Sequence, residues 1–183
     1  MSEFCDLLSS EFCPYGDLSR LQLDRLEQHF GLLLAWNQKL NLTRITEIAE
    51  AVRFHYCESL FVGRAIPGGV LKVADLGSGA GFPGIPLAVL RPELRITLVE
   101  ANQRKAVFLR EAARDLANVK VLAVRIEDCG DRFDWVISRA VTPSEVLGSG
   151  LAPNFAIRPH PFSPTMQNVS PRGTSKLMSR NAQ

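Results

Sequence analysis

The chain has 183 residues, of which 46% are hydrophobic and 22% are charged, as expected of one globular domain with a substantial core. The formal net charge of +2 excludes a uniformly basic protein, so contact with nucleic acid would require a local patch. The sequence contains no apolar run of the roughly 18 residues that span a membrane. Its first residues do not resemble a signal peptide. We therefore expect a cytoplasmic location and no membrane contact.

Residue types that form disulfides or bind metals are few. Four cysteines are widely scattered without a C-x-x-C pair, and only three histidines are present. Scattered cysteines favour free thiols in a reducing compartment over disulfides or a zinc site. The sequence therefore predicts no metal centre.

The first third of the chain predicts helices. Apolar side chains recur at threes and fours over residues 17–40, and Ser19 with Gln22 fits a capping box at the start. A second helix is expected from Thr46 to Phe61. The run Pro67-Gly68-Gly69 is a break signal, and it marks the C-terminal boundary of this helical part.

Two polar pairs in this helical part each have more than one interpretation. His55 and Glu58 are three residues apart and therefore neighbours on the second helix. They either form a hydrogen-bonded pair that secures the packing or help to hold a substrate. Asn37 and Asn41 are four residues apart and share a helix face. We expect the asparagines to cap the helix end or to fix a loop.

The stretch from Val70 to Gly84 organises the rest of the chain. It begins with a short apolar run that ends in the carboxylate Asp75, which is typical of a buried parallel strand. Pro83 suits the first position of a following helix. Between them, glycine recurs where a Cβ would block a tight turn or a ligand, at Gly77, Gly79, Gly81 and Gly84. A strand, a glycine turn and a helix start are how a nucleotide-like cofactor is held.

The glycines alone leave the cofactor open. Gly79, Gly81 and Gly84 satisfy the dinucleotide fingerprint G-x-G-x-x-G, and Glu100 lies about 20 residues further on. Asp75-x-Gly77-x-Gly79 equally matches the first motif of S-adenosylmethionine (AdoMet) methyltransferases. A glycine-rich turn without any ligand is the third interpretation.

Strand and helix patterns alternate after this turn. Strands are expected at Arg95–Glu100, Val119–Val124 and Phe133–Ser138, and helices at Ile85–Leu90 and 103–117. Such alternation predicts a parallel sheet with right-handed crossovers. Ligands of these sheets bind beyond the carboxyl ends of the strands. Four polar residues fall there: Asp75, Glu100, Glu127 and Arg139.

The last part of the chain has a different composition. From Gly148 onward there are five prolines, five serines and four basic residues without an acid. This composition buries little apolar surface, so we expect an irregular tail. The sheet would then be incomplete on its C-terminal side, with Phe133–Ser138 as an exposed edge. We therefore divide the chain into a helical segment (1–69), an α/β cofactor-binding core (70–147) and a basic Pro/Ser-rich tail (148–183).

Several short motifs carry a resemblance over roughly residues 17–147. They are Trp36-Asn37, Asn41-Leu42-Thr43, His55 with Glu58-Ser59, Asp75 to Leu87, Arg91-Pro92, Arg104-Lys105 with Phe108-Leu109, Arg125 with Glu127, and Ser138-Arg139-Ala140. In their order and spacing the chain resembles the bacterial 16S ribosomal RNA guanine-N7 methyltransferases, also called glucose-inhibited division protein B. The resemblance implies a Rossmann-like class I AdoMet-dependent methyltransferase fold with AdoMet as cofactor.

The resemblance also implies individual roles. Carried over by position, the cofactor contacts are Gly77, Phe82, Ile126, Glu127 and Arg139. The strand-end chemistry adds Asp75, Gly79 and Glu100 to the cofactor-binding set. The implied substrate is one guanine of 16S ribosomal RNA or of the small ribosomal subunit, with no DNA partner, and we expect a monomer.

Guanine N7 carries a free lone pair and no proton, so its methylation needs no general base, only alignment of the reactants. No catalytic acid or base is therefore assigned, and Arg139 is the candidate that forms the cofactor and guanine pocket. Residues for substrate or RNA contact are Asn41, Arg44, His55, Lys105 and Arg139, with Lys39, Arg53 and Arg110 as further phosphate candidates. The alternative function is a non-catalytic module that binds AdoMet or a nucleotide together with RNA or a protein.

Overall fold

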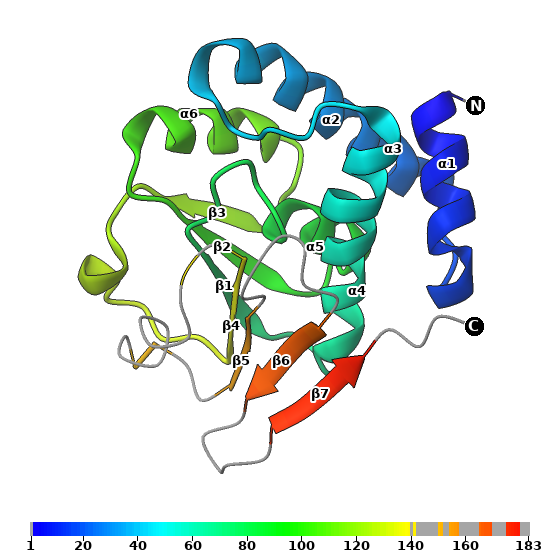
Figure 1. Cartoon of the computed structure of the whole chain (residues 1–183). Coiled ribbons are helices and arrows are strands. Elements are labelled where there is room, and N and C mark those ends of the chain that lie inside the picture. Colours follow the sequence, from blue (N-terminus) through cyan, green and yellow to red (C-terminus); the bar gives the residue numbers. More distant parts are fainter. Residues whose placement is uncertain are drawn as a thin grey trace.

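The computed structural model describes residues 2–139, 141, 150–151, 154–157, 165–169 and 175–179. Its centre is one sheet with the strand order β3-β2-β1-β4-β5-β6-β7 (Figure 1). The strands are β1 (Lys72–Leu76), β2 (Arg95–Val99), β3 (Val119–Leu122), β4 (Trp135–Ser138), β5 (Asn154–Ile157), β6 (Thr165–Val169) and β7 (Ser175–Ser179). Strands β1 to β5 pair in parallel, whereas β6 pairs antiparallel with both β5 and β7.

The helices precede the sheet or connect its strands. They are α1 (Glu3–Phe12), α2 (Arg20–Leu40), α3 (Ile48–Ala51), α4 (Glu58–Ala65), α5 (Gly84–Leu90) and α6 (Gln103–Ala112). Between α3 and α4 the chain continues as a π-helical turn, Val52–Cys57, so these three pieces form one helical element. Short 3-10 helices occupy Cys13–Tyr15 and Ile126–Asp128. In the described part of the chain, no helix is both long and apolar enough to cross a membrane.

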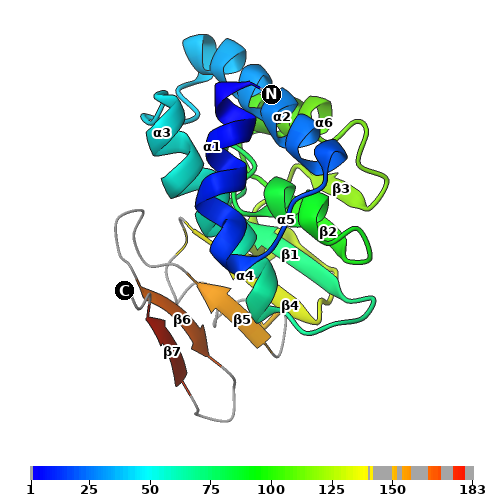
Figure 2. The same ribbon diagram turned by 90° about the vertical axis from the view of Figure 1, so that its right-hand side faces the viewer.

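The main core lies between the helices and one face of the sheet. Alternate residues of a strand point to opposite faces, so Val73, Leu98 and Ile137 point toward the helices, whereas Ala74 and Val136 belong to a smaller cluster on the other face. Figure 2 shows α1, α4 and α5 lying over the helix-covered face. The helical segment and the sheet thus share one continuous core, which fixes the helices relative to the carboxyl ends of the strands.

Most predicted elements are present. The predicted capping box exists, since the Ser19 hydroxyl accepts from the Gln22 amide while the Gln22 side chain accepts from the Ser19 amide. The helix expected over 103–117 ends at Ala112. Helix α1 was not predicted, although its buried residues Phe4, Leu8 and Phe12 recur at intervals of four.

The C-terminal side of the sheet differs from the expectation. The prediction of an irregular tail is wrong for β5, β6 and β7, and β4 is an interior strand between β1 and β5 rather than an edge. The physical reason is that strand pairing satisfies backbone N–H and C=O groups, including those along the outer side of β4, without requiring an apolar core. The expected boundary at 147 and 148 and the basic residues Arg158, Arg172 and Arg180 lie outside the described residues.

Candidate cofactor site

The turn between β1 and α5 is built on glycine. Gly77, Gly79 and Gly81 have φ angles of +69°, +55° and +85°, a conformation that residues with a side chain rarely adopt. Gly84 is required for a different reason, because a Cβ there would lie 2.3 Å from Leu98 Cδ2 and 2.7 Å from Asp75 Oδ2. The turn therefore brings α5 against the sheet and leaves its backbone open to close approach.

Asp75 lies beneath this turn and is fully buried. Its Oδ2 accepts a hydrogen bond from the Gly84 amide at 3.0 Å, whereas its Oδ1 has no hydrogen-bond partner among the described residues. Burial raises the pKa of Asp75 to about 7, against the opposing effects of the Gly84 amide and the positive charge of Arg139. A buried carboxylate with one free oxygen suits a cationic ligand, whose charge would offset the cost of burial.

Glu100 follows β2 directly and contacts the same turn from the other side. Its Oε2 accepts from the Gly79 amide at 2.9 Å and its Oε1 from the Asn102 amide at 2.8 Å. Asn102 in turn caps the N-terminus of α6. Glu100 therefore joins the glycine turn to the start of α6, and each carboxylate oxygen retains a lone pair for a ligand hydroxyl.

Arg139 follows β4 and is held by two rings. Its Nη1 donates to His55 Nδ1 at 2.7 Å, and its guanidinium carbon lies 5.1 Å from the centre of the Phe82 ring. The His55 ring stacks on Phe82 with the centroids 4.6 Å apart and an interplanar angle of 23°. Burial lowers the pKa of Arg139 to about 10, so the guanidinium remains protonated near neutral pH. The parallel sheet thus brings Asp75, Glu100 and Arg139 to one edge.

The remaining predicted cofactor residues lie around this edge. Ile126 and Glu127 form part of the 3-10 helix after β3, with Ile126 partly buried against the smaller core cluster and Glu127 exposed. The segment after β4 approaches the glycine turn, because a Cβ on Gly77 would lie 3.0 Å from Val141 Cγ2. Ala140, which belongs to the motif after β4, lies outside the described residues.

The predicted RNA-contact residues divide into exposed and enclosed ones. Asn41 is the exposed C-cap of α2 with φ +47°, and Arg44 is exposed in the following loop. The expectation that the asparagines cap a helix end or fix a loop is confirmed, since Asn41 is the C-cap of α2 and the Asn37 side chain bonds both the amide and the carbonyl of Thr43. Lys105 is partly buried on α6.

His55, by contrast, is buried and hydrogen-bonded to Thr43 and Arg139, so the described structure does not present it at the surface. Arg53 is exposed and forms an ion pair with Glu11 at 2.8 Å.

Sequence reasoning missed one residue of this region, His29. Its Nε2 lies 3.1 Å from the Ala80 carbonyl oxygen, so it donates there, and its Nδ1 therefore accepts from the Tyr56 hydroxyl at 2.9 Å. Burial lowers the pKa of His29 to about 4, which keeps the ring neutral. His29 thus supports the glycine turn from α2. The sequence carries no local signal for this contact, because Ala80 lies 51 residues away along the chain.

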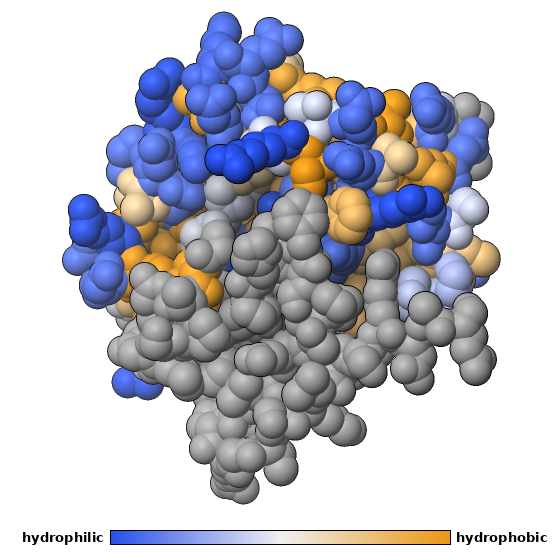
Figure 3. Space-filling view, in the orientation of Figure 1, coloured by the Kyte–Doolittle hydropathy of each residue, from blue (hydrophilic) through white to orange (hydrophobic). Residues whose placement is uncertain are grey.

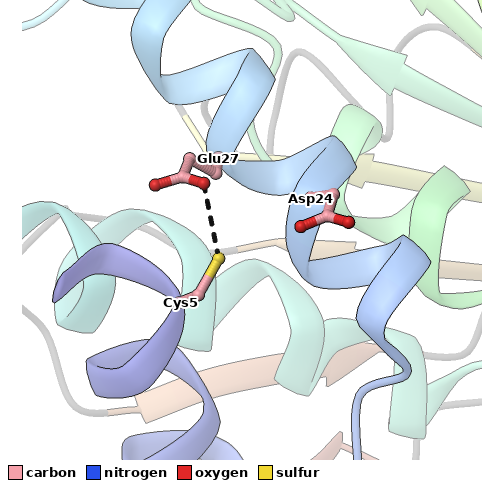
Figure 4. A group of neighbouring side chains, drawn as sticks. All are labelled: Cys5, Asp24 and Glu27. Carbon is pink, nitrogen blue, oxygen red and sulfur yellow. Dashed lines mark hydrogen bonds between the residues drawn. The ribbon is translucent and has the colours of Figure 1, made fainter. Parts of the chain in front are cut away.

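Among the described residues, one group of potential metal ligands lies between α1 and α2 (Figure 4). Cys5, Asp24 and Glu27 place their ligand atoms within 4.8 Å of one another. The Cys5 thiol donates to Glu27 Oε2 at 3.6 Å, and Asp24 forms an ion pair with Arg20 at 2.8 Å. Burial raises the pKa of the Cys5 thiol, which favours the protonated form over a thiolate ligand. These contacts explain the group as a link between two helices.

The parallel strands β1 to β5, the glycine turn after β1, the buried acid beneath it and the second acid after β2 form the Rossmann-like arrangement that class I methyltransferases share with dinucleotide-binding proteins. A family model described as rRNA small subunit methyltransferase G matches residues 22–154. The chain belongs to this family of AdoMet-dependent methyltransferases. Of the two cofactors that the glycine pattern left open, membership of this family supports AdoMet over a dinucleotide.

Individual relatives carry the name ribosomal RNA small subunit methyltransferase G. The one from Caldanaerobacter subterraneus subsp. tengcongensis is 41% identical over 140 residues, which cover 71% of this chain and 58% of the relative. The one from Halorhodospira halophila is 41% identical over 149 residues, covering 77% of this chain and 70% of the relative. The one from Roseiflexus sp. is 35% identical over 161 residues, covering 84% and 69%. The chain therefore spans little more than half of the first relative and about seven tenths of the other two.

Proposed function

We propose that this chain transfers a methyl group from AdoMet to N7 of a guanine in 16S ribosomal RNA. The observation that carries the proposal is the buried carboxylate of Asp75, whose Oδ1 has no hydrogen-bond partner in the described structure, directly beneath a glycine turn. AdoMet supplies an electrophilic methyl group on a sulfonium and carries a second positive charge on its ammonium. A carboxylate in this position fits such a cationic ligand and does not suit the pyrophosphate of a dinucleotide.

The other cofactor roles follow from position. Gly77 and Gly79 leave the backbone of the turn open, and Glu100 retains lone pairs for the ribose hydroxyls. Ile126 with Glu127 lies where the adenine would be held, and Phe82, which is buried with its ring stacked on His55, makes this side of the site apolar. The site thus has an anionic part for the methionine end and an apolar part for the base.

Arg139 is the residue that we assign to the guanine. Because its guanidinium stays protonated near neutral pH, it acts only as a hydrogen-bond donor. An arginine can donate to the O6 of guanine, and that contact would orient the adjacent N7 toward the methyl group. Attack by the N7 lone pair releases no proton, so alignment and exclusion of water account for the catalysis.

The RNA would approach over exposed basic residues rather than over a globally basic surface. In Figure 3, hydrophilic side chains gather at the upper left of the molecule, where Figure 1 shows α6 and the end of α2 that leads into the following loop, and hydrophobic patches lie to their right. The exposed or partly exposed candidates there are Lys39, Asn41, Arg44, Lys105 and Arg110. We propose phosphate contacts for these side chains, which fix position without reading sequence. We further propose that the protein acts as a cytoplasmic monomer on 16S ribosomal RNA or the assembled small subunit.

The test is incorporation of a labelled methyl group from AdoMet into small-subunit RNA from cells that lack this modification. The expected product is N7-methylguanine at one site, mapped by chain cleavage at the methylated base. Naked 16S RNA and assembled small subunits, offered separately, identify the form of the substrate. Binding of AdoMet and RNA without methyl incorporation would instead support the alternative, a non-catalytic binding module.

A further inference from the structure

We propose that Thr43 and His55 form a positioning pair that holds Arg139 at the cofactor site, with His55 as a neutral imidazole protonated on Nε2. The expected effect of this pair on methyl transfer rests on the proposed function, whereas the hydrogen bonds and the tautomer of His55 do not depend on it. It assigns His55 a role other than contact with RNA.

The direction of each hydrogen bond follows from the chemistry of the groups. His55 Nδ1 lies 2.7 Å from Arg139 Nη1, and a guanidinium N–H can only donate, so Nδ1 must accept. The ring proton is then on Nε2, which lies 2.8 Å from Thr43 Oγ1 and donates to it. The amide of Ile45 also donates to Thr43 Oγ1, at 3.0 Å. Because Nε2 carries the ring proton, the Thr43 hydroxyl oxygen accepts from both His55 and Ile45, one through each lone pair.

The surroundings fix the imidazole ring in this orientation. His55 is buried, and it lies on the π-helical turn Val52–Cys57. Turns of this kind occur mostly as short interruptions of α-helices and often at functional sites. Its ring stacks on Phe82, while the Asn37 side chain holds the backbone of Thr43 at 2.9 and 3.0 Å. A connected series of contacts thus runs from α2 to the carboxyl end of β4.

A neutral imidazole orients Arg139 without neutralising its charge, which a carboxylate in its place would do. A carboxylate would pair with the guanidinium and offset its positive charge. The Nδ1 lone pair instead fixes the orientation of Arg139 while leaving its charge and its other N–H groups available. Because that lone pair is already used, His55 is not a general base but a positioning residue.

Two matched substitutions separate positioning from simple packing. The amide oxygen of asparagine in His55→Asn takes the place of Nδ1, whereas the amide group of glutamine in His55→Gln takes the place of Nε2. We expect His55→Asn to keep kcat for methyl transfer within about threefold of the unaltered chain, and His55→Gln to lower it about tenfold or more, because only the former retains an acceptor for Arg139. Thr43→Val serves as the companion variant and should lower kcat by a smaller factor than His55→Gln.

A measurement on the unaltered, cofactor-free chain tests the tautomer without any activity. Nitrogen-15 NMR of the imidazole should show Nε2 protonated and Nδ1 unprotonated at neutral pH. Protonation of Nδ1, or equal activity of the two His55 variants, would overturn the proposal. Should the unaltered chain fail to methylate RNA, the proposed function fails, and the NMR result alone then supports or refutes the pair.

Discussion

Asp75 and Glu100 are two carboxylates at the carboxyl ends of neighbouring parallel strands, and both are buried, with exposed fractions of 0% and 9%. They differ in how their oxygens are used. Both oxygens of Glu100 accept backbone amides, from Gly79 and Asn102, whereas Asp75 uses one oxygen for Gly84 and leaves the other without a hydrogen-bond partner among the described residues. The backbone contacts of the fold alone account for Glu100, whereas burial of Asp75 lowers the stability of the ligand-free fold, a cost that binding of a cationic ligand would offset.

The largest effect expected from this comparison is a pH dependence of stability. The pKa of Asp75 is raised from 3.8 to about 7, so its protonated form is favoured in the folded chain. Its contribution to stability is fully present below pH 3.8 and is lost as the pH rises through about 7. Relative to Asp75→Asn, the unaltered chain should lose up to about 4 kcal/mol of unfolding free energy over this window. Urea titrations of both chains between pH 4 and 8 measure it, and parallel curves for the two chains would contradict the account.

The second effect is on cofactor affinity. Asp75→Asn preserves the shape of the side chain and an acceptor for the Gly84 amide but removes the negative charge. We expect the Kd for AdoMet to rise by about 30- to 100-fold, which corresponds to the loss of a charge-assisted contact of about 2 to 3 kcal/mol. Calorimetric titration at pH 8 measures it. An unchanged Kd in a folded Asp75→Asn chain would show that Asp75 does not face the cation.

The third and smallest effect is on the stability contributed by Glu100. Glu100→Ala removes the acceptor of the Gly79 and Asn102 amides, and we expect the unfolding free energy to fall by about 2 kcal/mol. Glu100→Gln, which keeps one acceptor oxygen, is the matched control and should lose about half of that. Thermal denaturation of the ligand-free chains gives the comparison. If Glu100→Ala weakened AdoMet binding without lowering stability, the two carboxylates would not differ as described.

The sequence predicted the features that depend on local chemistry. Some features depend only on residues that are close together in the sequence, so their geometry could be predicted directly. These are the capping box at Ser19, the glycine turn and the acid near the end of β1. The strands and most helices followed from the hydrophobic pattern for the same reason. Helix α1 was not predicted, although its buried residues Phe4, Leu8 and Phe12 have the spacing of one helix face.

Contacts between distant residues could not be predicted in this way. His55 and Arg139 are 84 residues apart, and their hydrogen bond depends on a π-helical turn that leaves no mark in the apolar pattern. His29 likewise reaches Ala80 only through the packing of α2 on the sheet. The strands β5 to β7 were missed because the Pro/Ser-rich composition of the last part of the chain predicted no regular structure, whereas pairing between backbones does not depend on that composition.

Binding of AdoMet at the edge formed by the glycine turn, Asp75 and Arg139 is the property on which the proposed activity depends. It is tested most directly by calorimetric titration of the purified chain with AdoMet, with NAD as the control ligand. We expect saturable binding of AdoMet with one site per chain and no heat of binding with NAD. A folded chain that bound NAD, or that bound neither compound, would contradict it.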